Sequence, residues 1–460
     1  MISLADKLSQ SLGQVQLQRA RSQGVLTRVV GLTLEATGVN APVGSYCDII
    51  SPSGAILMAE VVGFGDGKLL LMPFGSIQGI AAGFKVKPQV QSQNTAMSRS
   101  MLGRVLDGMG QPLDGGPDIV AEEHRSILGQ PINPLKRRPI DQALDVGVRS
   151  INALLTVGCG QRLGLMAGSG VGKSVLMGMM TRFTQADVIV IGLIGERGRE
   201  VQEFVLDSLG EEGLARSVVV AAPGDTSPVT RLHAARLATT IAEFFRDQGK
   251  SVLFLMDSIS RVAQAQREIG LAIGEPPTTK GYPPSVFTLI PNLMERAGNG
   301  HEDSQGAITA FYTVLAEGDD QQDPVVDAAR SVLDGHIVLS RELASSGHYP
   351  AIDINQSISR LAPALQGLGQ KQSGKQLRQW LNSYAENKDL ITVGAYQAGR
   401  NILLDQALDK KLDMDRFLQQ GMHDSCDMAT SLDHFADPCS TATTRIPAIG
   451  NPAGHALTTR

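Results

Sequence analysis

One short segment, Ala167–Ser174, limits what this chain can fold into more than any other part of the sequence. It reads Ala-Gly-Ser-Gly-Val-Gly-Lys-Ser, follows the apolar run Arg162–Met166, and precedes apolar residues at helical spacing. A glycine-rich turn between a strand and a helix, ending in Lys-Ser, is the pattern of a phosphate-binding loop. Its backbone N–H groups and the helix N-terminus both attract phosphate oxygens. The segment therefore predicts an α/β nucleotide-binding domain.

The individual positions of this loop have separate expected roles. Lys173 is expected to reach the β- and γ-phosphates of ATP, and the Ser174 hydroxyl is expected to bind Mg²⁺. Ala167 stands where the strict motif has glycine, and so small a residue predicts only a mild change in the loop. The alternative is a glycine-rich turn with a surface lysine. The predicted nucleotide-binding residues are Gly168, Ser169, Gly170, Val171, Gly172, Lys173, Ser174 and Val175.

Two carboxylates stand directly after apolar strand patterns. Asp257 ends the run Ser251–Met256, where a carboxylate can hold magnesium through water. Glu196 follows the run Val188–Ile194, at the strand edge where ligands of α/β sheets bind. A carboxylate there can polarise the attacking water. The alternatives are an ordinary strand-end aspartate and a surface charge cluster.

The rest of the chain divides into segments of different pattern. Residues 1–20 have one narrow apolar stripe and are interpreted either as a helix folded back on its own domain or as a docking helix. Closely spaced β-type runs predict a small barrel over 21–97. Alternating strand and helix patterns predict a mostly parallel sheet within an ATPase domain over 98–361. Residues 362–433 have helical periodicity, and 434–460 are predicted to be a mobile tail.

Composition excludes several classes of protein. The 460 residues carry a net charge of −5 and only 4% aromatic side chains, which argues against a bulk nucleic-acid binder. The four cysteines are widely spaced and show no disulfide or zinc pattern. No apolar run is long enough for a membrane span or a signal peptide. We expect a cytoplasmic protein whose membrane association is peripheral.

Several further motifs resemble those of the flagellar and type III secretion export ATPases, relatives of the catalytic subunit of rotary ATP synthases. The resemblance covers roughly residues 24–420 and implies a RecA-like P-loop core between a β-barrel and a helical C-terminal domain. The proline-rich loop is more similar to the flagellar branch, whereas 222–226 and the stretch after Gly399 depart from it. The motifs are Gly158–Val175, Gly195–Val201, Ala242–Asp247, Gly274–Pro284, Ala310–Leu315, Asp334–Arg341, Tyr349–Asp353 and Ser357–Arg360.

The resemblance implies roles that the patterns alone do not give. Glu196 would activate water, with Arg197 near the γ-phosphate. Arg360 would be an arginine finger that acts across a subunit interface, and Tyr349 would pack on the adenine ring. From the sequence alone, a capping or ion-pairing role is favoured for Arg360, and Tyr349 is equally a core residue.

The resemblance also implies partners. The family forms a homohexameric ring below the membrane proteins of an export gate, and handles export substrates and their chaperones. Helix 1–20 would bind a stator-like regulator, and the loop Glu275–Pro284 would face a central coiled-coil stalk protein.

Four other kinds of protein share parts of this sequence pattern. An injectisome ATPase belongs to the same family. A rotary ATP synthase catalytic subunit would need a second, related subunit in its ring. An RNA translocase resembling Rho would need an aromatic or basic RNA platform, which the sequence before residue 90 lacks. A non-catalytic ring member would be expected to lack Lys173 or Glu196, and both are present.

Overall fold

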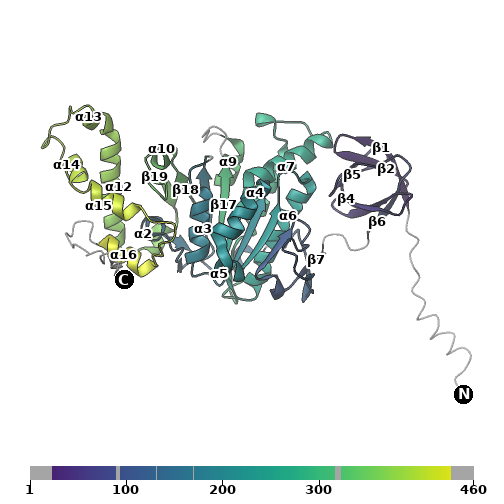
Figure 1. Cartoon of the computed structure of the whole chain (residues 1–460), viewed down its shortest axis with the longest axis horizontal. Helices are drawn as coiled ribbons and strands as arrows, with labels where there is room; N and C mark the ends of the chain where they lie inside the picture. The colour runs from purple at the N-terminus through teal and green to yellow at the C-terminus, as the bar shows by residue number, and fades with distance from the viewer. Residues whose placement is uncertain (1–22, 90–93, 131, 169, 316–322, 437–460) are drawn as a thin grey trace, which may run out of the picture.

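The computed structural model describes residues 23–89, 94–130, 132–168, 170–315 and 323–436 (Figure 1). The predicted helix over 1–20 and the loop residue Ser169 lie outside these ranges, as does most of the predicted tail. The helix α16 runs to Ala436, so the first three residues of the segment 434–460 are helical rather than tail. Within the described ranges, none of the helices is long and apolar enough to cross a membrane.

A closed six-stranded barrel lies at one end of the molecule, and a group of helices lies at the other (Figure 1). Alternate barrel residues such as Leu34, Ile49 and Val61 point inward and are buried. Two short strands, β2 and β6, were not among the predicted runs. In barrel order the strands are β1 Gly24–Val30, β2 Thr33–Thr37, β5 Lys68–Pro73, β4 Ile56–Gly65, β3 Tyr46–Ile50 and β6 Lys85–Pro88.

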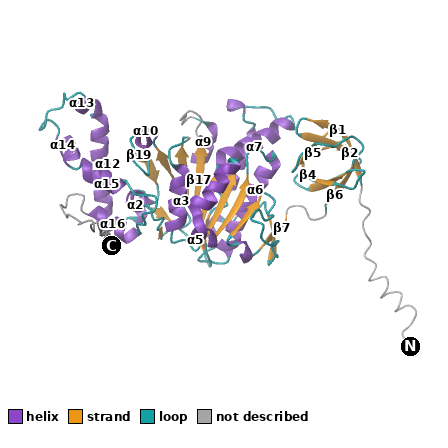
Figure 2. Ribbon diagram, viewed as in Figure 1, coloured by secondary structure: helices purple, strands orange, loops and turns teal. Residues whose placement is uncertain are grey.

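The centre of the molecule is a nine-stranded sheet between two layers of helices (Figure 2). The described pairs are parallel except where β19 meets β18 and where β16 meets β17. This arrangement confirms the predicted fold class. In order across the sheet, the strands are β19 Ile352–Ser359, β18 Gly335–Leu339, β12 Arg162–Ala167, β17 Ala307–Leu315, β15 Ser251–Asp257, β13 Val188–Ile194, β14 Ser217–Ala222 and β8 Arg104–Asp107, with β16 Gly298–Asn299 beside β17.

Strand β13 shows why both faces of this sheet must be covered. All seven of its residues are buried, and they alternate between two separate cores. Val188 and Val190 pack with α6, α7 and α8, whereas Ile189 and Ile191 pack with α3. The helices around the sheet are α3 Lys173–Phe183, α4 Gly198–Glu203, the π-helical η3 Phe204–Leu209, α5 Gly210–Ala215, α6 Pro228–Asp247, α7 Ile259–Ala272, η4 Thr279–Gly281, α8 Pro284–Met294, α9 Pro324–Arg330 and α10 Arg341–Ser345.

The helical C-terminal region packs on the core that contains α3. Trp380 is buried there and donates its ring N–H to Gln406 at 3.2 Å, while Phe417 stacks on Phe435. The C-terminal helices are α11 Ala362–Leu365, α12 Leu368–Glu386, α13 Lys388–Thr392, α14 Ile402–Asp409, α15 Lys411–Leu418 and α16 Met428–Ala436. Three of them, α12, α15 and α16, contact the earlier helix α2 Arg149–Leu154.

The segment between barrel and sheet contributes short elements. Its strand β8 extends the central sheet at one edge, next to β14. The other elements are β7 Asn94–Met97, η1 Arg99–Met101, β9 Glu123–Ser126, η2 Pro134–Lys136, β10 Ala143–Leu144 and β11 Val157–Gly158.

Candidate nucleotide-binding site

The predicted phosphate loop lies between the carboxyl end of β12 and the first residue of α3, Lys173. Gly170 and Gly172 have φ angles of 79° and 90°, in the left-handed region that glycine adopts without strain. A side chain at Gly172 would also come within 3.3 Å of the Tyr349 ring. The glycines therefore allow a tight backbone turn at the N-terminus of α3, where unpaired N–H groups can receive an anion.

Three charged side chains from three separate elements meet beside this loop. Lys173 Nζ lies 2.5 Å from Asp257 Oδ1 and 3.7 Å from Glu196 Oε1. Asp257 ends β15 and is buried, and its Oδ1 also accepts a hydrogen bond of 2.6 Å from the Thr313 hydroxyl on β17. The fold thus brings the predicted lysine and both predicted carboxylates together. Thr313 was not identified from the sequence.

The surroundings of Glu196 shift its acidity. Burial, with a further contribution from the nearby Asp257 charge, raises the pKa of Glu196 from 4.5 to about 7, although Lys173 opposes the shift. A carboxylate with a pKa near neutral pH can accept a proton from water at physiological pH and release it again. Strongly shifted carboxylates in a cleft are typical of functional sites.

A cavity of about 430 Å³ is lined by Lys173 and Glu196. Arg261, which no sequence motif indicates, lines the cavity as well. It lies in the first turn of α7, directly after Asp257, and its buried Nε has no hydrogen-bond partner among the described residues. A cation in the first turn after a strand-end carboxylate was the signal that could have identified it. The lining residues are Gly168, Gly170, Gly172, Lys173, Ser174, Val175, Gly195, Glu196, Arg197, Glu200, Arg261 and Leu315.

The remaining loop residues differ in exposure. Ser174 and Val175 line the cavity, and Val175 is exposed. Val171 is buried in the core beneath the loop, so its side chain packs there and only its backbone can serve a ligand. Arg197 lines the rim with an exposed side chain that pairs with Glu200 at 3.1 Å.

Tyr349 and Arg360 lie at opposite ends of β19. Tyr349 precedes this strand, is 44% exposed, and lies against Gly172 of the loop. Arg360 follows the strand, is exposed, and donates its backbone N–H to Asp334 O at 2.9 Å. Asp334 lies beside Arg162, where β12 begins, whereas the phosphate loop lies where β12 ends. A six-residue strand spans roughly 16 Å, so Arg360 is remote from the loop of its own chain.

The oxygen groups of this site suit a magnesium ion. Mg²⁺ prefers hard oxygen ligands and is usually held by one or two carboxylates together with substrate phosphates. The Asp257 carboxylate and the Ser174 hydroxyl are oxygen donors of this kind beside the phosphate loop. The described residues contain no cluster of three or more His, Cys, Asp or Glu that would form a site from protein alone.

Comparison with protein families gives three matches along the chain. Residues 26–89 match the β-barrel domain of the ATP synthase alpha/beta family, and residues 147–359 match its nucleotide-binding domain. Residues 369–437 match the C-terminal domain of the type III secretion ATPase EscN.

Similar proteins and structures agree with these matches. The chain is 59% identical to the flagellum-specific ATP synthase of Pseudomonas aeruginosa, over 89% of this chain and 91% of the relative. It is 54% identical to that of Salmonella typhimurium, over 90% and 93%. The assembled ATPase EscN of the enteropathogenic Escherichia coli type III secretion system superimposes with a TM-score of 0.85 at 39% identity, covering 90% of this chain and 99% of EscN.

Proposed function

This chain belongs to the family of flagellar and type III secretion ATPases, and from that premise we propose how its residues divide the work of ATP hydrolysis. The chain is an export ATPase with a nucleotide as its substrate. The observation that carries the residue assignment is the meeting of Lys173, Glu196 and Asp257 beside the phosphate loop, where Lys173 and Glu196 line one cavity.

Binding of ATP falls to the loop and to Tyr349. In our proposal the backbone of residues 168–175 surrounds the β-phosphate, and Lys173 exchanges its contact with Asp257 for the β- and γ-oxygens. The Tyr349 ring, exposed beside Gly172, packs on the adenine base. These contacts hold the γ-phosphate over Glu196.

Hydrolysis then depends on placement of water and charge more than on covalent chemistry. Glu196 orients the attacking water and accepts its proton, for which a pKa of about 7 is suited. Arg197 and Arg261, which both line the cavity, supply positive charge to the γ-phosphate. The variant Glu196→Gln should bind ATP but hydrolyse it poorly, and wild-type turnover would contradict the assignment.

Magnesium is the proposed cofactor. Ser174 and Asp257 would hold it, with Thr313 fixing the Asp257 carboxylate through its hydrogen bond. When bound, the ion supplies charge that neutralises the phosphate oxygens.

Arg360 is proposed to act on the nucleotide of a neighbouring copy. Its remoteness from its own loop supports this role, because the side chain cannot cross the length of β12. Arginine fingers contribute about 10³–10⁵ in rate, so Arg360→Ala should be nearly inactive. Mixing this variant with inactive Lys173→Ala should restore some hydrolysis, because mixed rings contain interfaces with an intact loop and an intact finger. No recovery at any mixing ratio, with mixed rings verified, would refute a finger that acts in trans.

The proposed assembly and partners of this chain are inferred from its relatives. EscN has been determined as an assembled ATPase and in complex with its central stalk EscO. We propose a homohexamer for this chain, with the loop 275–284 facing a coiled-coil stalk and residues 1–20 binding a stator-like regulator. The ring would lie in the cytoplasm, peripheral to the inner-membrane export gate, and receive export substrates and chaperones rather than nucleic acid.

The flagellar branch is favoured over the injectisome branch. Flagellum-specific relatives reach 59% identity, whereas the type III secretion system ATPase of Xanthomonas euvesicatoria is 47% identical. Deletion in the native host should abolish motility and leave effector secretion intact. Loss of secretion with retained motility would instead assign the chain to an injectisome.

A further inference from the structure

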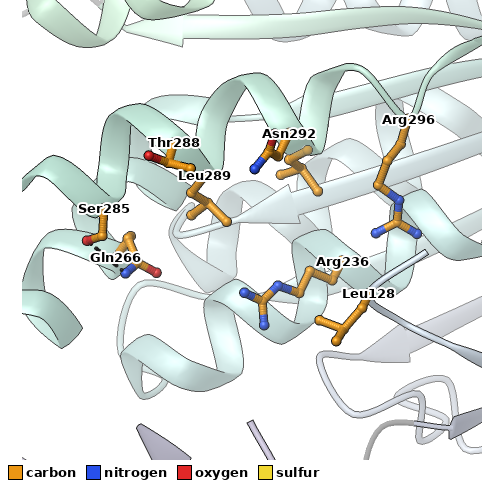
Figure 3. A pocket seen from close by; sticks show the side chains of 9 residues that line it. Leu128, Arg236, Gln266, Ser285, Thr288, Leu289, Asn292 and Arg296 are labelled. Atoms are coloured by element: carbon orange, nitrogen blue, oxygen red, sulfur yellow. Dashed lines mark hydrogen bonds between the residues drawn. The ribbon is translucent and has the colours of Figure 1, made fainter. Parts of the chain in front are cut away.

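A second cavity, of about 500 Å³, lies on the opposite side of the sheet from α3, between α6, α7 and α8 (Figure 3). Arg236 of α6 extends beneath α8, toward Leu289 and Asn292. The loop after β9 contributes Leu128 to the wall, and Arg296 stands at the far end. This size falls within the range of small-molecule sites, which combine apolar walls with a few polar groups. The nucleotide site shares none of these residues.

The two arginines of this cavity differ in their partners. Arg296 is held by four hydrogen bonds, because its nitrogens donate to both carboxylate oxygens of Glu243, to the Thr240 hydroxyl and to Ile127 O. Arg236 makes no hydrogen bond or ion pair with any described residue, although it is half-buried and burial lowers its pKa. A partly buried guanidinium is stabilised when a ligand supplies an acceptor. The cavity therefore presents one positive charge that has no hydrogen-bonded partner among the described residues.

The remaining lining limits what that acceptor can be. Asn292 and Thr288 have side chains without hydrogen bonds to described residues, so each can donate to a ligand oxygen. Leu128, Leu289 and Leu293 supply an apolar wall. One free guanidinium fork matches one carboxylate, whereas a phosphate dianion would bring a second charge that nothing here neutralises.

We propose that this cavity binds a monocarboxylate with a short apolar body, its carboxylate paired with Arg236 and its body against the three leucines. Such a ligand is either a free organic acid or the C-terminal carboxylate of a peptide with an apolar last residue. The site is independent of the export role.

The neighbouring barrel offers one competing explanation. Glu60 of β4 influences the pKa of Arg236, but the two do not form an ion pair within the described residues. Burial raises the pKa of Glu60 to about 7, so its carboxyl is only partly ionised near neutral pH. The Glu60 carboxyl therefore neutralises the charge of Arg236 only in part, and the guanidinium can still pair with a ligand carboxylate.

Calorimetric titration of the full-length protein tests the proposal. Hexanoate should bind more tightly than acetate, and hexanamide and inorganic phosphate should each bind at least tenfold more weakly than hexanoate. Arg236→Gln should weaken hexanoate at least tenfold, with unchanged circular dichroism. The matched control Arg416→Gln, at an exposed arginine of α15, should not change it. A tripeptide that ends in leucine distinguishes the sources: tighter binding than hexanoate indicates a chain terminus, and weaker binding a free acid.

Several outcomes would overturn the proposal. Hexanoate could fail to bind, phosphate could bind more tightly than hexanoate in a way that Arg236→Gln abolishes, or Arg236→Gln could leave the affinity for hexanoate unchanged. Leu289→Ala gives an independent check, because it should remove the dependence on chain length while retaining the carboxylate contact. Binding of hexanoate only to the Glu60→Gln variant would show that Arg236 is reserved for the barrel carboxylate, and would also refute the site.

Discussion

Glu196 should make the nucleotide-free protein less stable as the pH rises. Its pKa is about 7 in the folded chain and 4.5 without the fold, so the unfolded chain loses this proton first. Well below pH 4.5 the Glu196 carboxyl is neutral in the folded and the unfolded chain, so it does not lower the free energy of unfolding. Between 4.5 and 7 the folded state progressively loses stability, and above 7 the loss is complete. Since a tenfold change in an equilibrium constant is about 1.4 kcal/mol, the full loss is about 3 kcal/mol.

The neutral isostere Glu196→Gln should therefore stabilise the protein, and by an amount that depends on pH. We expect a gain of about 1 kcal/mol at pH 5 and about 3 kcal/mol at pH 8.5, where the wild-type carboxylate is ionised. For an ATPase domain of this size, 3 kcal/mol corresponds to a rise in Tm of roughly 6 °C. Differential scanning calorimetry without nucleotide, at both pH values, measures the gain.

A matched variant separates burial from a general effect of removing charge. Glu211→Gln, at an exposed carboxylate of α5, should show no comparable change between the two pH values. An equal gain for Glu196→Gln at pH 5 and pH 8.5, or no gain at either, would refute the reasoning. It would mean that burial does not raise the pKa of this carboxyl, and the proposed proton acceptor would lose its physical basis.

Two further predictions concern buried polar pairs. Thr313→Val removes the hydroxyl that donates to Asp257 at 2.6 Å, and should lower the free energy of unfolding in urea by about 1–3 kcal/mol. Thr313→Ser keeps the hydroxyl and should retain most of the stability. Equal losses for the two variants would contradict a role for the hydrogen bond. Glu243→Gln breaks the buried bidentate pair with Arg296 and should lower the free energy of unfolding in urea by about 3–5 kcal/mol. A loss of stability below about 1 kcal/mol would show that the other acceptors, Thr240 and Ile127, suffice to hold Arg296.

The sequence predicts best what is local in the chain. The strand, loop and helix around Lys173 follow one another directly, so their pattern already places the loop at a sheet edge. Asp257 was identifiable because an apolar strand stops there. The two short barrel strands, β2 and β6, carry too few apolar residues to be predicted, and β8 lies among glycines and prolines that obscure its strand pattern.

Contacts between distant segments are what the patterns could not give. Thr313 is an ordinary strand residue until β17 is placed beside β15, and only then does its hydroxyl meet Asp257. Tyr349 lies 177 positions after Gly172, and no periodicity connects the two. Arg236 is likewise one polar residue on a long helix in the sequence, because only the packed structure shows that it has no hydrogen-bond partner among the described residues.

Strand direction places the phosphate loop and the proposed arginine finger of one chain at opposite ends of the sheet. Parallel strands present their carboxyl ends at one edge of the sheet, where Lys173, Glu196 and Asp257 gather. Strand β19 runs antiparallel to β18. It therefore begins near Tyr349 and the phosphate loop, and it ends at Arg360, where the parallel strands begin. Reversal of this one edge strand therefore gives each copy a loop at one sheet edge and an exposed guanidinium at the other. In the proposed mechanism, Arg360 therefore acts on the nucleotide of another copy, and the proposed activity belongs to the assembly.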